Sequence, residues 1–211
     1  FQGQLLGREF AVWRADDDFV NVWENRCLHR GVRLSIGQNE GLELRCQYHG
    51  WRYASRSAGC TYIPAHPADA PARTICNRTF PSVERYGLIW SGEDPAGEPP
   101  QIAALEDSET LLLRSIAVNA PIKLVLGHLA NYHFSITADP DNLATTSIDY
   151  QDERSLSLTA TSDDKESTVV FFVQPVDSNR SVIRGLLSSS PSGTERLPTL
   201  RHHSMELSRL R

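Results

Sequence analysis

Short apolar, β-rich runs alternate with polar turn residues along the first hundred residues of the chain. EFAVWRADDDFVNVWEN has a β-rich run on each side of Asp16, Asp17 and Asp18, which is the pattern of two strands joined by a polar turn. GLELRCQYHGWRY and RYGLIWSGED have the same character, and each carries a glycine beside its apolar residues. This part of the chain is therefore predicted to be all β.

The alternation stops at residues 91–101, where the sequence is SGEDPAGEPPQ. Glycine, proline and acidic residues at this density are typical of linkers, because they favour turns and bury little apolar surface. We therefore predict two domains, at residues 1–97 and 98–211.

Longer elements are predicted after this linker. LLLRSIAVN has the composition of a strand, and IKLVLGHLANYHF has the length and apolar density of a helix that begins after Pro121. Four β-rich runs follow between about residues 145 and 190, with a hairpin turn at residues 177–179 before the last of them. The tail is predicted to be a helix with one apolar face, at Leu200, Met205, Leu207 and Leu210.

The composition is that of a globular protein, with 211 residues of which 40% are hydrophobic and 22% are charged. The 21 basic and 26 acidic residues give a formal charge of -5 without a long basic run, so neither nucleic acid nor an anionic membrane is expected as a partner. The longest apolar stretches, such as VVFFV, are far shorter than a membrane span. No signal peptide is recognised, and the expected location is cytoplasmic.

The four cysteines, at positions 27, 46, 60 and 76, are expected to bind metal or to stay free, because disulfides are rare in the cytoplasm. Cys60 and Cys76 have no histidine at ligand spacing, so we expect both to be small buried apolar residues.

The other two cysteines each have a histidine close by in sequence. CLHRG contains Cys27 and His29, CQYHG contains Cys46 and His49, and sixteen residues (30–45) separate the two pairs. Structural zinc sites usually begin with two cysteines two to four residues apart, so this order argues against zinc. A mixed Cys2His2 cluster of two irons needs one cysteine and one histidine from each loop, and both loops supply them.

CLHRG and CQYHGW resemble the Rieske iron-sulfur motif in the form found in the large subunits of Rieske non-haem iron oxygenases. The resemblance implies that Cys27 and Cys46 bind one iron and that His29 and His49 bind the other. It also implies an α+β fold, in which an all-β Rieske [2Fe-2S] domain precedes an antiparallel-sheet, helix-grip catalytic domain that is incomplete in this chain.

High-potential Rieske proteins have an extra cysteine in each loop and a serine after the second loop. Here Gly31, Gln47 and Tyr48 lie in the loops, and Trp51 follows the second one. The expected potential is therefore near the low end of the Rieske range, about -150 mV. Such a potential suits reduction by an NAD(P)H-dependent reductase with flavin and a ferredoxin centre.

HLANYH places His128 and His133 at a spacing near one helical turn. It resembles the family segment that provides two ligands of a mononuclear non-haem Fe(II), whose third ligand is a carboxylate far downstream. Two features depart from the family: Val125 stands where an acidic residue is usual, and the carboxylate is unplaced, with Glu195 and Glu206 the nearest acids. The alternative is that both histidines are ordinary residues of a helix surface.

The other histidines are expected at the surface. His202 and His203 are neighbours and therefore point in different directions from a helix, and His66 lies in the proline-rich IPAHPADAP.

The resemblance implies a terminal oxygenase that activates O2 for monooxygenation or oxidative demethylation of an aromatic substrate. Residues near CQYHGW and IPAHP favour the monooxygenase branch over the ring dihydroxylases. A homotrimer is implied as well, because electrons cross between subunits in this family. The alternative is a Rieske electron-transfer or binding protein without catalytic iron.

Overall fold

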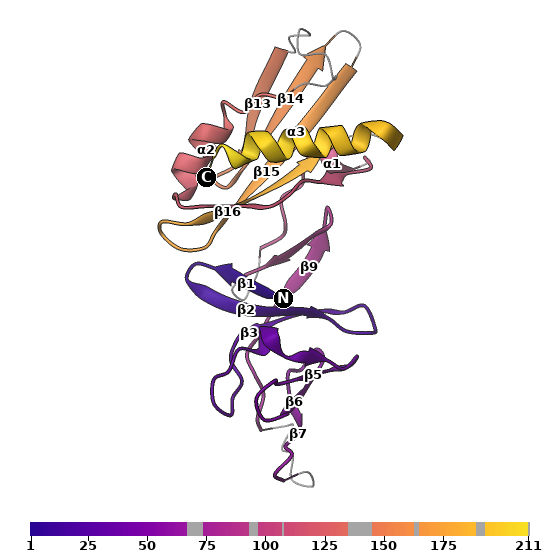
Figure 1. The fold of residues 1–211 in the computed structure, drawn as a ribbon, viewed down its shortest axis with the longest axis vertical. Coiled ribbons are helices and arrows are strands. Elements are labelled where there is room, and N and C mark those ends of the chain that lie inside the picture. The colour runs from indigo at the N-terminus through magenta and orange to yellow at the C-terminus, as the bar shows by residue number, and fades with distance from the viewer. Residues whose placement is uncertain are drawn as a thin grey trace. The chain divides into compact units, whose positions relative to one another are not determined.

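The structure is a computed structural model, which describes residues 1–66, 74–92, 97–106, 108–134, 145–162, 165–188 and 193–210. The chain divides into two compact units, Phe1–Pro99 and Pro100–Arg211 (Figure 1). This division falls within the segment at residues 91–101 where the sequence places the linker.

The first unit is built from short antiparallel strands. One sheet has the order β1-β2-β3-β8, with strands Gln2–Leu5, Arg8–Arg14, Val20–Glu24 and Thr79–Phe80. The second has the order β4-β5-β6-β7, with strands Gln38–Asn39, Glu43–Arg45, Arg52–Ala54 and Cys60–Tyr62. β9 (Ser82–Arg85) and β10 (Leu88–Ser91) form a separate hairpin, and η1 (Leu34–Ile36) is a 3-10 turn.

A single apolar cluster joins the two sheets of the first unit. Trp13 of β2 packs edge-on against Trp23 of β3 at 5.1 Å between ring centroids, and Trp23 packs edge-on against Tyr53 of β6 at 6.5 Å. The predicted hairpin is confirmed, since β2 pairs with β3 and Asp18 takes a left-handed φ of 65° in the turn. The β2-β3 hairpin thus supplies one wall of the core in which Cys27 and Cys46 lie.

The second unit contains one antiparallel sheet of six strands. The order is β11-β16-β15-β14-β13, and β12 also pairs with β16; the bounds are Leu111–Leu112, Ile116–Val118, Thr145–Asp152, Ser155–Ser162, Lys165–Pro175 and Ser181–Leu187 for β11 to β16. The four predicted strands of the meander are confirmed. LLLRSIAVN, predicted to be one strand, forms the two short strands β11 and β12 instead.

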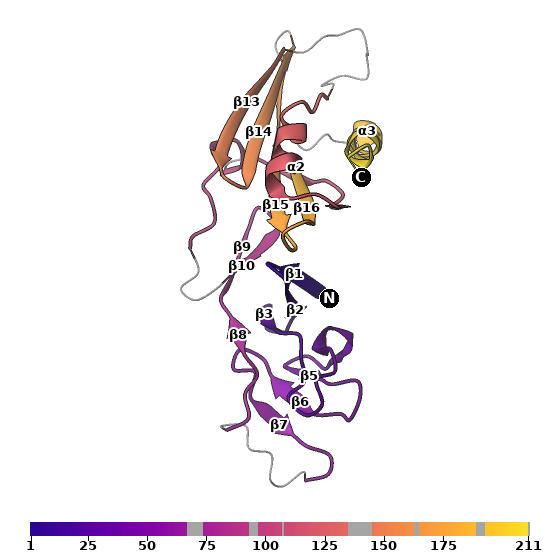
Figure 2. The same cartoon turned by 90° about the vertical axis from the view of Figure 1, so that its left-hand side faces the viewer.

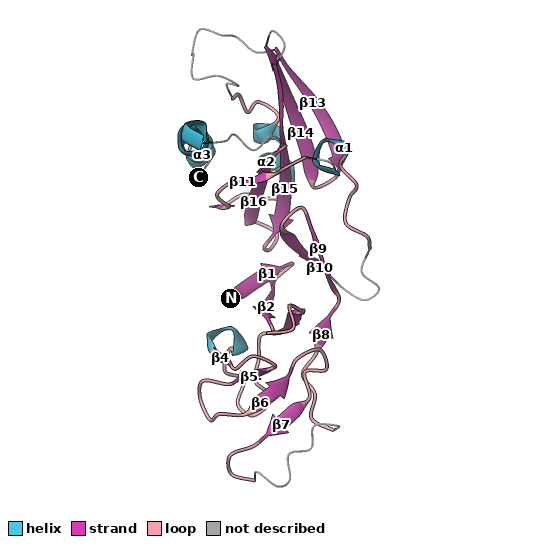
Figure 3. Cartoon of the chain, turned by 90° about the vertical axis from the view of Figure 1, so that its right-hand side faces the viewer, coloured by secondary structure: helices cyan, strands magenta, loops and turns pink. Residues whose placement is uncertain are grey.

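Helices lie on both faces of this sheet. Figures 2 and 3 show α2 (Ile122–Leu129) and α3 (Arg196–Ser208) on one face and the short α1 (Ala103–Glu106) on the other. The apolar core lies between the sheet and the α2-α3 side, where Phe171 of β15 and Leu158 of β14 are fully buried. In the described part of the chain, none of the helices is both long and apolar enough to cross a membrane.

The prediction for the tail helix was partly wrong. Leu207 is buried, and Leu200 and Leu210 pack against the core, but the Met205 side chain is 64% exposed. An α-helix turns by about 100° per residue, so Met205 lies on nearly the opposite side of α3 from Leu207.

Replacement of Gly185 by alanine is expected to destabilise the second unit. A Cβ atom at this position of β16 would lie 2.9 Å from both Leu113 Cδ1 and Phe171 Cε1, and the buried ring has little room to move. The free energy of unfolding should fall by about 1–3 kcal/mol, measured by urea unfolding.

Gly127→Ala is the matched control, because a Cβ atom at Gly127 of α2 would meet nothing within 4 Å. This variant should gain about 0.5–1 kcal/mol, since alanine favours a helix. Equal stability of the two variants would contradict the close packing inferred at Gly185.

Candidate metal centre

Two five-residue loops, at residues 27–31 and 46–50, have nearly the same backbone. In each loop the cysteine N–H donates to the carbonyl five residues further on, at 2.8 Å in both. The N–H of the closing glycine donates back to the cysteine carbonyl, at 2.8 Å for Gly31 and 3.1 Å for Gly50. Both glycines have left-handed φ, 70° and 71°, which other residues rarely adopt. The local sequence therefore presents one cysteine and one histidine from each of two similar turns.

The chain between the loops passes close to its own backbone at Gly37. A Cβ atom there would lie 2.5 Å from the Arg45 carbonyl oxygen and 2.9 Å from that of Leu34. Only glycine allows this approach, which brings η1 against the residue that precedes the second loop.

The two cysteines form the buried side of the site. The side chains of Cys27 and Cys46 belong to the core of the first unit and are 4% and 2% exposed. Burial raises the pKa of the Cys46 thiol, and hydrogen bonding and charge interaction with Cys27 raise it further, so the two thiols are close neighbours. Without metal the Cys46 thiol is therefore protonated at neutral pH, and metal binding must release the proton.

Tyr53 provides a polar contact to this thiol pair from β6. Its hydroxyl lies 3.2 Å from Cys27 Sγ and accepts a hydrogen bond from Leu28 N at 3.3 Å. Burial, followed by the neighbouring Cys27, raises the Tyr53 pKa, so the hydroxyl keeps its proton. This contact joins residues 26 positions apart, and no local pattern in the sequence indicates it.

The two histidines form the exposed side of the site. The ring centroids of His29 and His49 are 4.7 Å apart, and His29 stacks on Trp51 at 4.9 Å with nearly parallel planes. Desolvation lowers the pKa of His29, and the positive charges of His49 and Arg30 lower it further. The neutral imidazole, which is the form that binds metal, is thus favoured.

The donor set fits a cluster of two irons. Such a cluster takes two protein ligands at each iron, and here two thiols lie together and two imidazoles lie together. Among the described residues, no three or more His, Cys, Asp or Glu side chains converge as they would around one metal ion. A tetrahedral zinc needs all four donors around one centre, so the paired arrangement suits the two-iron cluster better.

The other cysteines differ from each other. Cys60 is fully buried in the same core, as predicted, and burial raises the pKa of its thiol. Cys76 is exposed, so the prediction of a buried residue was wrong. Its backbone pairs with Gly59, and in an antiparallel pair side chains alternate between the two faces, which explains why Cys60 and Cys76 are not buried together.

The prediction that HLANYH lies on one helix was wrong, because the helix ends inside this segment. α2 begins after Pro121 but ends at Leu129, so His128 is in its last turn and His133 lies beyond the helix, in a segment that is neither helix nor strand. Both histidine side chains are exposed. The spacing of the two imidazoles is therefore set by residues 130–132 and not by the pitch of a helix.

Val125 is buried, whereas the two acids nearest in sequence to a third ligand, Glu195 and Glu206, lie on or next to α3. Val125, in the position where the family has an acid, is buried in the core of the second unit. Glu195 is exposed at the end of η3 (Gly193–Glu195), whereas Glu206 forms an ion pair with Arg209 at 2.8 Å. Burial raises the pKa of Tyr132, and the negative charge of Glu206 raises it further. A carboxylate of α3 is therefore close enough to Tyr132 to interact with it electrostatically.

His203 is not a surface residue, and the prediction for it was wrong. Its side chain is 1% exposed, and its Nδ1 lies 2.6 Å from the Tyr132 hydroxyl, whereas the neighbouring His202 is exposed, as is His66. Burial, with a smaller effect of His202, lowers the pKa of His203 to about 4. His203 lies four residues before the buried Leu207, one turn along the same face of α3, a spacing that the prediction did not consider.

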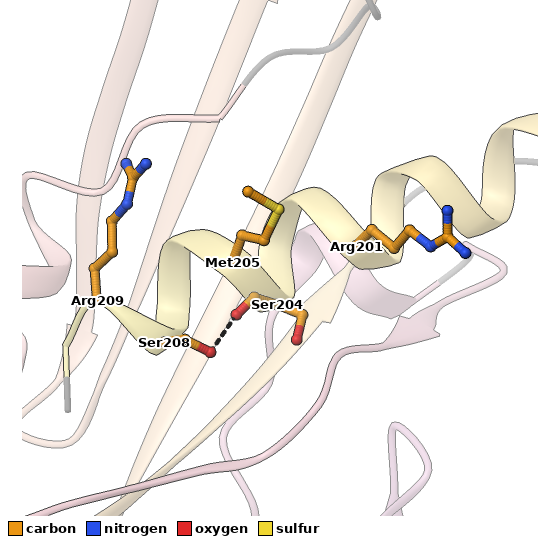
Figure 4. Close-up of a pocket in the computed structure, with 5 residues that line it drawn as sticks. All are labelled: Arg201, Ser204, Met205, Ser208 and Arg209. Carbon is orange, nitrogen blue, oxygen red and sulfur yellow. Dashed lines mark hydrogen bonds between the residues drawn. The ribbon is translucent and has the colours of Figure 1, made fainter.

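A pocket of about 440 Å³ lies along the outer side of α3 (Figure 4). Its lining comes from one helix, with Arg201, Ser204, Met205, Ser208 and Arg209. None of the predicted metal ligands belongs to it, and Figure 4 shows its side chains spread along the helix without a common centre.

Comparison with known proteins identifies the first domain. Residues 1–84 match the family described as Rieske [2Fe-2S] domain. The chain is 46% identical over 135 residues to Oxidoreductase NdmD of Pseudomonas putida, covering 61% of this chain and 23% of that protein. It is 37% identical over 108 residues to Methylxanthine N1-demethylase NdmA of the same species, covering 49% and 30%. The chain therefore spans less than a third of either of these relatives.

Solved structures extend the similarity to the second unit. Pseudomonas putida CBB5 NdmA matches 99% of this chain and 72% of its own, with a TM-score of 0.75 at 21% identity. Dicamba monooxygenase, solved with non-heme iron and dicamba, matches 89% and 71%, with a TM-score of 0.71 at 20% identity. The predicted fold is confirmed: an all-β Rieske domain is followed by an antiparallel sheet with its helices, in the arrangement found in the NdmA and dicamba monooxygenase structures.

The buried His203 is expected to make stability depend on pH. Its folded-state pKa of about 4 is below the ordinary value of 6.5, so between these values the unfolded chain binds a proton that the folded chain does not. Stability should fall by roughly 3 kcal/mol as the pH drops from about 6.5 to 4, and then level off for this group.

Urea unfolding of the full chain at several pH values measures this loss. His203→Asn should remove most of the extra slope, and His202→Asn, at the exposed neighbouring position, should keep it. An identical pH dependence in the two variants would show that His203 is not neutral and buried in solution.

Proposed function

We propose that this chain, whose residues 1–84 form a Rieske [2Fe-2S] domain, is the terminal oxygenase component, or part of it, of a Rieske non-haem iron system. Residues 1–97 are the cluster domain and residues 98–211 are part of a helix-grip catalytic domain. The observation that carries the proposal is the pairing of two buried thiols and two exposed imidazoles on two matched loops.

Within the cluster site, Cys27 and Cys46 bind one iron, and His29 and His49 bind the other. When bound, the cluster accepts and releases single electrons. The protein buries the thiolate side in the core and keeps the imidazole side at the surface, where a redox partner can approach closely. Stacking on Trp51 holds the His29 ring in one plane.

The electron donor is an NAD(P)H-dependent reductase that carries flavin and a ferredoxin centre. The Tyr53 hydroxyl lies within hydrogen-bonding distance of Cys27 Sγ, at 3.2 Å. Hydrogen bonds to the sulfur ligands raise the potential of an iron-sulfur cluster. The loops contain Gly31, Gln47 and Tyr48 and lack the extra cysteines of high-potential proteins. A low potential, suited to such a reductase, is the expected result.

In the second domain, His128 and His133 bind a mononuclear non-haem Fe(II), at which O2 is activated. Their exposure leaves both imidazoles accessible to a metal ion. Support comes from the similarity in fold to dicamba monooxygenase, which was solved with non-heme iron. The third ligand is a carboxylate that the described residues do not place beside this pair.

The reaction class is monooxygenation or oxidative demethylation of an aromatic compound. Relatives named methylxanthine N1-demethylase and toluene-4-sulfonate monooxygenase subunit TsaM1 support this branch over ring dihydroxylation, and they favour an oxygenase over a simple electron carrier. The protein is cytoplasmic and forms a homotrimer in this proposal, so that the cluster of one subunit reduces the iron of the next.

Counting of iron and acid-labile sulfide on anaerobically purified protein tests the proposed function. We expect about three irons for every two sulfides, since the cluster contains two and the catalytic site one. About two irons per two sulfides would support a Rieske electron-transfer protein without catalytic iron. A colourless preparation that contains only zinc would contradict both functions.

The ligand set is tested by His29→Cys. This variant should retain a cluster with a lower reduction potential, because the imidazole ligands raise the potential of a Rieske centre. His66→Cys, at an exposed histidine of the same domain, is the matched control and should leave the potential unchanged. Equal potentials in the two variants, measured by redox titration with electron paramagnetic resonance, would remove His29 from the ligand set.

A further inference from the structure

A buried polar pair joins the end of the HLANYH segment to α3. Tyr132 is 6% exposed and His203 is 1% exposed, and the Tyr132 hydroxyl lies 2.6 Å from His203 Nδ1. The two rings are stacked, and Phe171 of the sheet packs edge-on against Tyr132 at 5.0 Å. The pair is thus enclosed by apolar groups, where a hydrogen bond is strong and its loss is costly.

The position of Tyr132 determines what this bond can control. After α2 two backbone hydrogen bonds hold the chain in a turn. The Asn131 N–H donates to the His128 carbonyl at 3.0 Å, and the Tyr132 N–H donates to the Leu129 carbonyl at 2.9 Å. Residues 132–134 follow outside any helix or strand, and along them the residues are buried, exposed and buried in turn. His133 is therefore directed outward by the two inward anchors on either side of it.

Both inward anchors contact the same residue of α3. The ring of Phe134 lies 5.5 Å from that of His203, which also accepts or donates the bond to Tyr132. Only His203 and Leu207 are fully buried among the described residues of α3. An apolar residue at position 203 would give α3 comparable packing without the cost of burying an imidazole. The imidazole adds a directional hydrogen bond. Only one placement of residues 132–134 against α3 lets the Tyr132 hydroxyl and His203 Nδ1 bond to each other.

We propose that the Tyr132–His203 hydrogen bond fixes the direction of the His133 side chain relative to His128. His203 is then a positioning residue for the metal pair, and α3 controls the geometry of a site to which it need not contribute a ligand. This inference rests on the proposed function of His128 and His133 as iron ligands.

The first test needs no metal in the second domain. The ring signals of His133 are assigned in the NMR spectrum of the full chain by their absence in His133→Gln. Tyr132→Phe and His203→Leu should both shift these signals, because each removes the hydrogen bond and keeps most of the bulk. His202→Leu, at the exposed neighbour, should leave them unchanged.

The second test measures binding of Co(II) as a probe for the histidine pair. Both bond-deleting variants should bind Co(II) roughly tenfold more weakly, the low end of the effect of supporting residues on metal sites. His203→Asn keeps a hydrogen-bonding atom near the position of Nδ1 and should restore much of the affinity. If His203→Leu does not fold, the comparison of Tyr132→Phe with His203→Asn gives the same answer.

The outcomes separate this inference from the function on which it rests. Lower thermal stability with unchanged His133 signals and unchanged Co(II) affinity would overturn it, because the bond would then only stabilise the fold. If the wild-type chain binds no Co(II) at this pair, the proposed iron site fails. In that case the His133 signals still decide: a shift in the bond-deleting variants supports the positioning role, and no shift overturns it.

Discussion

The backbone closure of the two cysteine loops is the constraint on which the metal centre depends. Each loop returns its chain through a left-handed glycine, so that a cysteine enters the core while a histidine of the same turn stays at the surface. Because the two loops have nearly the same backbone, the two thiols lie next to each other and the two imidazoles lie next to each other. The proposed division of ligands between two irons follows from this geometry, and Tyr53 adds a contact to the Cys27 sulfur.

In the second unit a six-stranded sheet provides the scaffold, and the helices determine which residues are accessible. α2 stops at Leu129, and the following residues are held against the core by Tyr132 and Phe134. α3 packs on the same side through Leu207 and His203. The histidine pair therefore belongs to a segment whose shape depends on a helix more than sixty residues further along the chain.

Strand patterns could be predicted from the sequence because short runs rich in β-branched, aromatic and other apolar residues lie between turn residues. The β2-β3 hairpin and the four strands of the meander were predicted in this way. The errors share a physical cause. Met205 was assigned to the core and His203 to the surface by residue type and local spacing, although the orientation of α3 decides which of its faces is buried. Cys76 was placed in the core for the same reason, whereas its strand partner directs it to the surface.

The sequence by itself determined the types and spacing of the proposed cluster ligands, because each cysteine, histidine and glycine acts within a turn of five residues. It also determined the order of the two domains, since the linker composition is local. Tertiary structure alone decided that Tyr53 contacts Cys27 and that His203 contacts Tyr132. Residues that are far apart in the chain meet only after the sheets and helices have packed, and no local pattern records which of them will do so.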